Sequence, residues 1–340
     1  MELIRGWVKQ YFSDPQVIIL TLLIIFGIAV VTVAGDFLAP VIASIVIAYL
    51  LEPVVQAGAR VRIPRGVGTY LVFGGFLLVV IAVVFGLVPL LSRQVTQLFQ
   101  QVPGMLGQGQ ESLMALPQRY PTLFTEAQVE QLLGTLRDEL ALFGQAIVSR
   151  SLASVVSVIT FMVYLILMPL MVFFFLKDKT TILEWFGGYL PENRALAASV
   201  WHDVDRQIGN YIRGKIWEIL VVWAASYVFF AWIGLQFSAL LAFLVGISVI
   251  IPYVGATVVT IPIAVVGFYQ WGWSYEFGLL LGGYLAIQAL DGNLLVPLLF
   301  SEVVNLHPIA IIVAVLFFGG IWGVWGVFFA IPLATLVQAI

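Results

Sequence analysis

The sequence contains no cysteine and only two histidines, His202 and His307, among its 340 residues. Without cysteine the protein has no disulfides and no thiolate ligands for a metal, and the redox compartment stays undetermined. Two isolated histidines do not make a histidine-rich metal centre. We therefore expect neither a bound metal nor a cofactor.

Charge is also scarce, because charged residues make up 10% of the chain and hydrophobic residues 62%. A soluble domain is about 45–50% apolar and about 25% charged. The apolar runs are continuous and exceed the alternating strands of about ten residues that build a membrane β-barrel. We predict an all-α polytopic integral membrane protein with about eight transmembrane helices in a lipid bilayer.

Positive charge stops early, since no lysine or arginine follows Lys215. Four acidic residues do follow it: Glu218, Glu276, Asp291 and Glu302. The C-terminal third therefore carries only negative formal charge, which attracts cations and offers no arginine clamp to an anionic substrate. The basic residues that precede it are scattered at the ends of apolar runs, so we expect no nucleic-acid partner.

The signatures of several enzyme classes are missing. There is no Gly-x-Ser-x-Gly stretch, no membrane Ser/His pair and no ATP-binding Walker A loop. Asp291 has no second intramembrane aspartate in a matching motif, as an aspartyl protease needs. We therefore expect the chain not to be an enzyme.

Apolar runs and their flanking residues divide the chain into membrane spans. The first three, within segment 1–91, are predicted at 17–34, 37–51 and 67–91, and the next two at 152–176 and 216–233. A tight turn at Gly35–Asp36 would separate the first pair, and Pro53 would end the second span. Lysine and arginine gather at the N-terminus and in alternate short loops, which places the N-terminus in the cytoplasm.

Two polar stretches interrupt the spans. In segment 92–150, Pro103, Pro117 and Pro121 would cut the chain into short extramembrane pieces, the last of them an amphipathic helix that begins with the Thr125–Gln128 capping pattern. We expect that helix to contribute to subunit contact. Segment 151–215 would combine the fourth span with a cytoplasmic amphipathic helix, and segment 216–340 would form the transport core.

The apolar stretch from Phe237 to Gln270 is too long for a single span. Pro252, Tyr253 and Gly255 lie in the motif IIPYVGA, and Pro262 follows. Glycine and proline interruptions of this kind point to a transporter binding site, although a plain proline kink is the other explanation. The stretch is therefore either one kinked span or two half-helices of a re-entrant hairpin that meet near 250–256.

The strongest candidate site lies in the apolar run Gly278–Phe300, which carries Gln288, Asp291 and Asn293 near its middle. A carboxylate at membrane depth is costly and is usually functional. Asp291, with Gln288 and Asn293, is predicted to bind a cation or proton, together with the backbone at Pro252, Tyr253 and Gly255. We expect helix breaks at Pro297 and Pro262. The alternative is that Asp291 only caps a helix break.

The last apolar run, Ile309–Val337, is predicted as one helix with Pro308 at its first position and a break near Pro332. It contains the GxxxG pair Gly319 and Gly323. Plain helix packing is the preferred explanation for these glycines.

Several motifs occur together in a known order and spacing. They are YLLEPVV (49–55), IPRGVG (63–68), FFFLKDK (173–179), NYIRGK (210–215), IIPYVGA (250–256), QALDGNLLVP (288–297) and LHPIAIIVAVLFFGGIWGVWGVFFAIP (306–332). In these motifs the chain resembles the autoinducer-2 exporter family of PerM-type permeases. The resemblance covers nearly the whole chain and is strongest over 173–332. Asp291 stands where the family usually has glutamate.

The resemblance implies a homo-oligomeric inner-membrane (plasma-membrane) protein that exports the signalling molecule autoinducer-2, which would place it in quorum sensing. Some relatives in the family are described as sodium(lithium)/proton antiporters. The expected function is therefore a secondary transporter of a small organic molecule, coupled to protons or cations. The alternatives are a Na⁺(Li⁺)/H⁺ antiporter and a passive channel or membrane scaffold.

Overall fold

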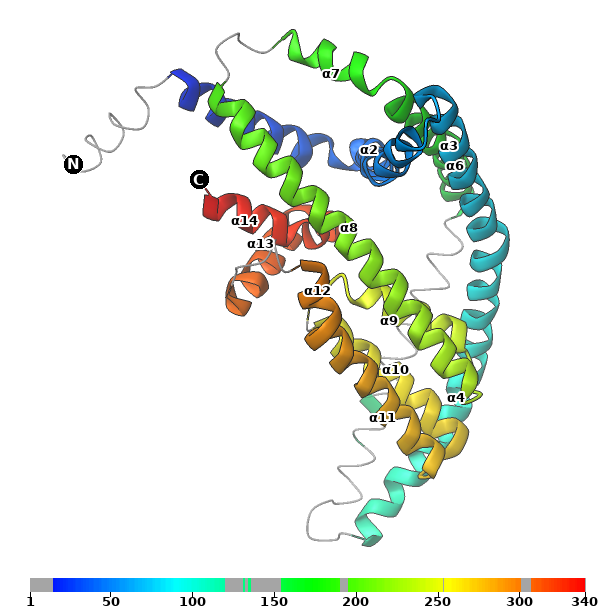
Figure 1. The fold of residues 1–340 in the computed structure, drawn as a ribbon. Helices are drawn as coiled ribbons and strands as arrows, with labels where there is room; N and C mark the ends of the chain where they lie inside the picture. Colours follow the sequence, from blue (N-terminus) through cyan, green and yellow to red (C-terminus); the bar gives the residue numbers. More distant parts are fainter. Residues whose placement is uncertain are drawn as a thin grey trace, which may run out of the picture. The chain divides into compact units, whose positions relative to one another are not determined.

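The computed structural model describes residues 15–119, 131, 134–135, 154–189, 195–252, 254–300 and 307–339. Every regular element in these ranges is a helix (Figure 1). Six helices are long and apolar enough to cross a membrane, and Ser238–Ser248 and Ile309–Gly323 are shorter apolar helices. The six are Leu38–Arg60, Arg65–Gly109, Thr160–Lys177, Asp205–Trp232, Val254–Trp271 and Tyr275–Phe300. The prediction of an all-α, multi-pass membrane protein is confirmed.

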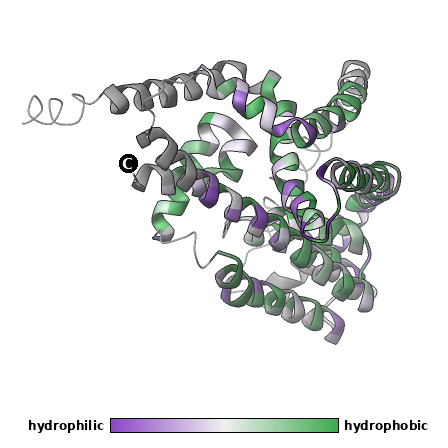
Figure 2. Ribbon diagram, turned by 45° about the horizontal axis from the view of Figure 1, so that its top comes forward, coloured by the Kyte–Doolittle hydropathy of each residue, from purple (hydrophilic) through white to green (hydrophobic). Residues whose placement is uncertain are grey.

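Hydrophobic residues predominate along these helices and polar residues occur in short patches (Figure 2). Many large apolar side chains are exposed, such as Leu78 at 69%, Phe85 at 74% and Leu298 at 71%. A soluble protein rarely exposes continuous apolar surface of this extent, whereas hydrocarbon chains of lipid cover such a surface without penalty.

The chain forms two compact units, each assembled from separate parts of the sequence. Unit 1 consists of residues 1–78, 164–216 and 298–340, and unit 2 of residues 79–163 and 217–297. The long helix α8 (Ala195–Trp232) contributes its first part to unit 1 and its second part to unit 2.

In unit 1, α2 (Pro15–Arg60) packs on α6 (Ser154–Lys177) through Ala48, Val55, Val172 and Leu176. The buried Ser44 hydroxyl donates to the Pro40 carbonyl at 2.6 Å and to the Met168 carbonyl of α6 at 3.3 Å. After α6 come the short helix α7 (Lys179–Gly187) and the start of α8.

Most of the predicted proline breaks within the N-terminal half are wrong. Helix α2 runs without a turn at Gly35–Asp36 and continues through Pro53. Helix α4 (Val88–Arg119) likewise continues through Pro103 and Pro117, while Pro121 lies outside the described residues. Proline removes one backbone hydrogen bond, which bends a helix and ends it only if nothing else supports the next turn.

The predicted amphipathic helix of 125–150 lies almost entirely outside the described residues, so its role in subunit contact stays a prediction. The division into segments 1–91, 92–150, 151–215 and 216–340 also stays a prediction.

The last apolar run bends at glycine and not at proline. Gly323 has φ 59° and ψ −134°, a conformation open only to glycine, and it interrupts α13 (Pro308–Phe328). A Cβ on Gly326 would strike the backbone carbonyl of Phe318, so the chain folds back tightly after Gly323. Helix α14 (Ala330–Ala339) contains Pro332 and packs on α13, while Pro308 occupies the first turn of α13 as predicted.

The helix α3 (Arg65–Ala82), most of which belongs to unit 1, passes into α4 of unit 2 through a five-residue π turn, η1 (Val83–Leu87). Helix α9 (Ser238–Ser248) and helix α10 (Val254–Trp271) follow α8. Helix α11 (Tyr275–Leu290) passes through a second π turn, η2 (Asp291–Leu295), into α12 (Val296–Phe300). Their buried apolar core includes Phe230, Leu241, Val245, Ile263 and Leu280.

Candidate functional site

Helices α9 and α10 form a hairpin, because α9 ends at Ser248 and α10 begins at Val254 and packs back against it. With 11 residues, α9 is about 17 Å long, roughly half of the hydrocarbon thickness. The structure therefore has a break after α9 in place of one continuous kinked span, and α10, with 18 residues, is long enough to cross a membrane. We call residues 249–253 the hairpin tip.

Four glycines let the helices around this hairpin approach closely. At each, an added Cβ would overlap a neighbouring helix: Gly246 with Trp223 of α8, Gly255 with Ser248 of α9, Gly267 with Leu280 of α11, and Gly283 with Phe229 of α8. The four seams join α8 to α9, α9 to α10, α10 to α11, and α11 back to α8. The two helices of the hairpin are therefore members of a closed ring of four helices in unit 2.

The base of the hairpin is fixed by glutamines. The Gln94 side chain of α4 accepts a hydrogen bond from the Leu240 backbone N–H at 2.8 Å, which satisfies a free donor in the first turn of α9. Gln270 accepts from the Gln236 N–H and donates to the Gly234 carbonyl, both at 2.8 Å. These glutamines were not among the predicted site residues. For Gln94, the one pattern in the sequence that could have indicated such a role is the run of glutamines on the polar helix α4.

The tip brings together a helix C-terminus and a helix N-terminus. The Ile251 N–H bonds to the Ser248 carbonyl at 3.1 Å and the Gly255 N–H to the Ile251 carbonyl at 2.9 Å, so the chain turns within a few residues. Pro252 is partly buried and Gly255 is buried, while Tyr253 lies outside the described residues. Opposed helix ends in a membrane can bind ions of either sign.

Asp291 is the first residue of the π turn η2. The Val296 N–H donates to the Asp291 carbonyl, five residues back, where an α-helix would use Gly292. The side chain of Asp291 is partly buried, and its Oδ1 atom is fully buried. Single π turns in helices occur frequently at functional sites.

Contacts between α10 and α11 place Asp291 at the level of the hairpin tip. Gly267 meets Leu280, and equal steps along the two antiparallel helices bring Asp291 opposite Ala256. The Tyr284 hydroxyl donates to the Ala256 carbonyl at 2.9 Å and lies 3.5 Å from the Thr260 hydroxyl.

The other predicted site residues divide into two groups. Gln288 is partly buried and lies within hydrogen-bonding range of the Tyr284 hydroxyl, on the side of α11 that packs against α10. Asn293 is exposed, and its amide donates to the Ala289 carbonyl of its own helix at 2.8 Å. The structure therefore brings Gln288 near the tip with Asp291 and leaves Asn293 on the surface of η2.

Neither predicted helix break at a proline ends a helix. Helix α10 runs through Pro262, and α12 contains Pro297. Each proline lacks the N–H that would bond four residues back, so it releases a carbonyl and the helix continues. At Pro297 the π turn η2 lies immediately before, and the widened turn absorbs the missing bond.

A second carboxylate, Glu218, lies at the same level on α8. Gly246 of α9 contacts α8 between Ile219 and Trp223, so equal steps bring Glu218 opposite the end of α9 and the tip. Glu218 is 3% exposed. The sequence shows an acidic residue in an apolar run here, but only the pairing of α8 with α9 puts it beside the tip.

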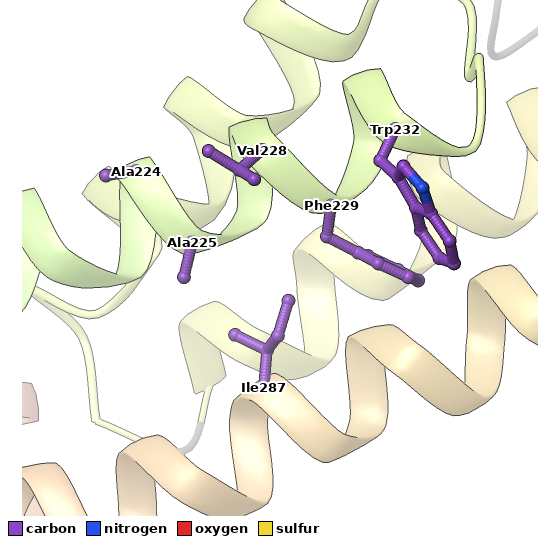
Figure 3. Close-up of a pocket in the computed structure, with 6 residues that line it drawn as sticks. All are labelled: Ala224, Ala225, Val228, Phe229, Trp232 and Ile287. Atoms are coloured by element: carbon purple, nitrogen blue, oxygen red, sulfur yellow. The ribbon is translucent and has the colours of Figure 1, made fainter.

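An apolar groove of about 520 Å³ lies between α8 and α11 (Figure 3). Its lining residues are Ala224, Ala225, Val228, Phe229, Trp232 and Ile287. It offers no charged group, so it suits hydrocarbon better than an ion. Within the described parts of the chain, no three histidine or carboxylate side chains gather as metal ligands.

Comparison with known proteins identifies the family of the chain. A family model described as AI-2E family transporter matches residues 18–340. The chain belongs to the AI-2E transporter family. It is 45% identical to PerM of Escherichia coli strain K12, whose name describes it as a permease, over 100% of this chain and 96% of PerM.

More distant relatives cover the chain as completely. The transport protein YueF of Bacillus subtilis is 25% identical over 97% of this chain and 92% of its own length. TqsA of Escherichia coli strain K12, named as an AI-2 transport protein, is 23% identical over 94% of this chain and 91% of its own length. The AI-2E family is one of membrane permeases, which agrees with the predicted family and with the predicted class of transporter.

Proposed function

We propose that the protein is a secondary transporter that exports a small organic molecule similar to autoinducer-2 across the inner membrane, with its N-terminus in the cytoplasm. The observation that carries this proposal is the hairpin tip with Asp291 at its level. Broken helices in a membrane expose backbone dipoles to a substrate, and an ionisable side chain beside them couples transport to a cation or proton. The name of TqsA supports the substrate class.

Asp291 and Glu218 have distinct parts in this proposal. Both flank the tip from neighbouring helices, and Glu218 lies three residues after the buried Lys215 on α8. Asp291 binds and releases the coupling cation or proton, because its partly buried carboxylate lies in the π turn η2 between α11 and α12. Glu218 supplies negative charge on the opposite side of the tip.

A Na⁺(Li⁺)/H⁺ antiporter is the second candidate, and the two carboxylates at one level favour it. Two acids can bind a hydrated alkali cation in one state and protons in the other. In that case the organic substrate is incidental. A passive channel or membrane scaffold is the third candidate.

Parallel flux measurements in one batch of proteoliposomes distinguish the three. We expect autoinducer-2 uptake into inside-out vesicles that rises with an imposed proton or sodium gradient, and little Na⁺ or Li⁺ exchange without the organic substrate. Cation/proton exchange without the organic substrate would support the antiporter instead. Flux that does not depend on any imposed gradient would support the passive channel. The absence of any flux would support the membrane scaffold.

We also propose a homo-oligomer, in which the predicted amphipathic helix of residues 125–150 contributes to subunit contact. Residues before 120 are kept in the test, because α4 supports the hairpin base. We expect deletion of 121–150 to lower the assembly mass of the detergent-purified protein in native mass spectrometry. An unchanged assembly mass would contradict the assignment.

A further inference from the structure

Unit 1 contains a buried carboxylate that ties three separate motifs together. Glu52 of α2 is 7% exposed at its side chain and lies 3.1 Å from the Arg65 guanidinium and 3.5 Å from the Lys179 ammonium. Gln56 donates to it at 3.2 Å. A buried charge is costly unless it is paired, so these contacts hold the ends of α2 and α6 and the start of α3 at one place.

This arrangement gathers an excess of basic side chains at one end of unit 1. The Arg65 guanidinium also donates to the Leu176 carbonyl at 3.4 Å, which joins the loop 61–64 to the end of α6. Arg60, Arg62 and Lys177 are exposed around this junction. The acidic neighbours are Glu52, which already pairs with Arg65 and Lys179, and Asp178 and Glu184. Among the described residues of this junction, five basic groups therefore lie beside three acidic groups.

Beside this basic junction, α7 presents exposed aromatic side chains. Trp185 lies 4.8 Å from Phe186 and 5.0 Å from Tyr189, measured between ring centroids. They are 59%, 59% and 74% exposed, and Leu183 is 54% exposed. Tryptophan and tyrosine gather where a membrane meets water, and short amphipathic helices lie in that plane. Because α7 begins at Lys179, its aromatic cluster adjoins the basic groups.

We propose that this end of unit 1 binds the headgroup of an anionic phospholipid, with α7 lying in the membrane interface. Arginine binds phosphate oxygens through two parallel N–H groups, and Arg60 and Arg62 stand on one exposed turn that can supply them. Lys177 adds charge, and the rings of α7 contact the glycerol and upper acyl region. Glu52 positions Arg65 and Lys179, so the basic junction exists only when the three helix ends are assembled.

The occupant is a lipid and not free phosphate, for two reasons. All the basic groups lie at, or within two residues of, the ends of helices that are long and apolar enough to cross a membrane, where lipid headgroups are concentrated. The adjacent aromatic surface has no use in binding inorganic phosphate but suits a lipid body.

The test uses the full-length protein in detergent micelles with added phosphatidylglycerol, phosphatidylcholine or inorganic phosphate, read by native mass spectrometry and by thermal stability. We expect phosphatidylglycerol to bind and raise Tm, and the other two to have little effect. In R60Q/R62Q the preference for phosphatidylglycerol should fall by roughly 25-fold, because each of the two basic groups near a membrane surface contributes about a factor of five. W185A/Y189A should weaken binding of both lipids.

The matched control is R93Q/R206Q, which also removes two positive charges, one from α4 and one from α8, both outside the basic junction. It should retain the preference for phosphatidylglycerol. Equal binding of both lipids by the wild type, an unchanged preference in R60Q/R62Q, or an equal loss in the control would each overturn the proposal. A Tm rise with inorganic phosphate alone would identify an anion site in place of a lipid site.

Discussion

Two π turns in unit 2 share a backbone and differ in their side chains. Both η1 and η2 are five residues long, both contain a glycine, and both are followed by valine and proline, Val88–Pro89 and Val296–Pro297. In each, the valine N–H bonds to the carbonyl five residues back. Turn η1 is VVFGL, and its Val83 and Phe85 are exposed; turn η2 is DGNLL and begins with Asp291.

The shared backbone has a common cause. A proline ring collides with the carbonyl four residues before it and cannot donate to it, and a turn widened by one residue moves that carbonyl away. The geometry thus comes from the proline and is independent of function. What separates the turns is the carboxylate, and the position of η2 against the hairpin tip.

The largest expected difference comes from removing the carboxylate. Asp291→Asn keeps the shape of the side chain and removes its titration, so we expect normal expression and folding with coupled flux reduced to background or no longer dependent on pH. Flux in proteoliposomes across a pH series checks this. Asn293→Ala, in the same turn, is the control and should transport almost normally, since Asn293 bonds only to its own helix. Unchanged, pH-dependent flux in Asp291→Asn would mean that η2 is only a proline-induced bend.

Substitutions of the two prolines test the geometry of the π turns without changing a charged group. Pro297→Ala restores a backbone donor and favours an ordinary α-helical turn, which rotates Asp291 away from the tip. We expect flux to fall by roughly tenfold, since a shift of about 1 Å at a polar site costs at least that in rate. Pro89→Ala makes the same change at η1 and should leave flux near wild type. If both variants lose flux equally, the two turns are equivalent and the comparison fails.

A smaller set of effects concerns stability. Gly255→Ala puts a Cβ against the Ser248 backbone carbonyl, which cannot move aside, so we expect a loss of about 1–3 kcal/mol, seen as a lower Tm in detergent. Gly267→Ala meets the flexible end of Leu280 and should cost less.

The glycines of the two π turns complete that comparison. Gly86 and Gly292 have open space at the Cβ position. Gly86→Ala and Gly292→Ala should leave Tm unchanged or slightly higher, because alanine favours a helix by up to about 1 kcal/mol over glycine. A marked loss at Gly292 alone would show that η2, unlike η1, needs backbone freedom.

The helix breaks show which bends of the chain could be predicted from the sequence and which could not. An interruption at IIPYVGA was predicted, as a kink or a re-entrant hairpin, because glycine and proline fall together in a segment too long for one span. The breaks expected at Gly35–Asp36, Pro53, Pro103 and Pro117 do not exist, and the sharp bend of the last run occurs at Gly323. A proline loses one hydrogen bond, which the rest of a long helix can tolerate. A glycine at φ 59° and ψ −134° cannot remain in a helix at all.

Composition and local pattern by themselves determined that this is a multi-pass helical membrane protein, that its late segments are interrupted, and that Asp291 is the carboxylate in the middle of one of them. These properties depend on residues close together in the chain. Only the tertiary structure decided that Glu218 and Asp291 lie at one level of the hairpin tip, and that Glu52 pairs with both Arg65 and Lys179. Helix pairing sets these neighbours, and it depends on which glycines admit a close approach, which no periodicity along the chain reveals.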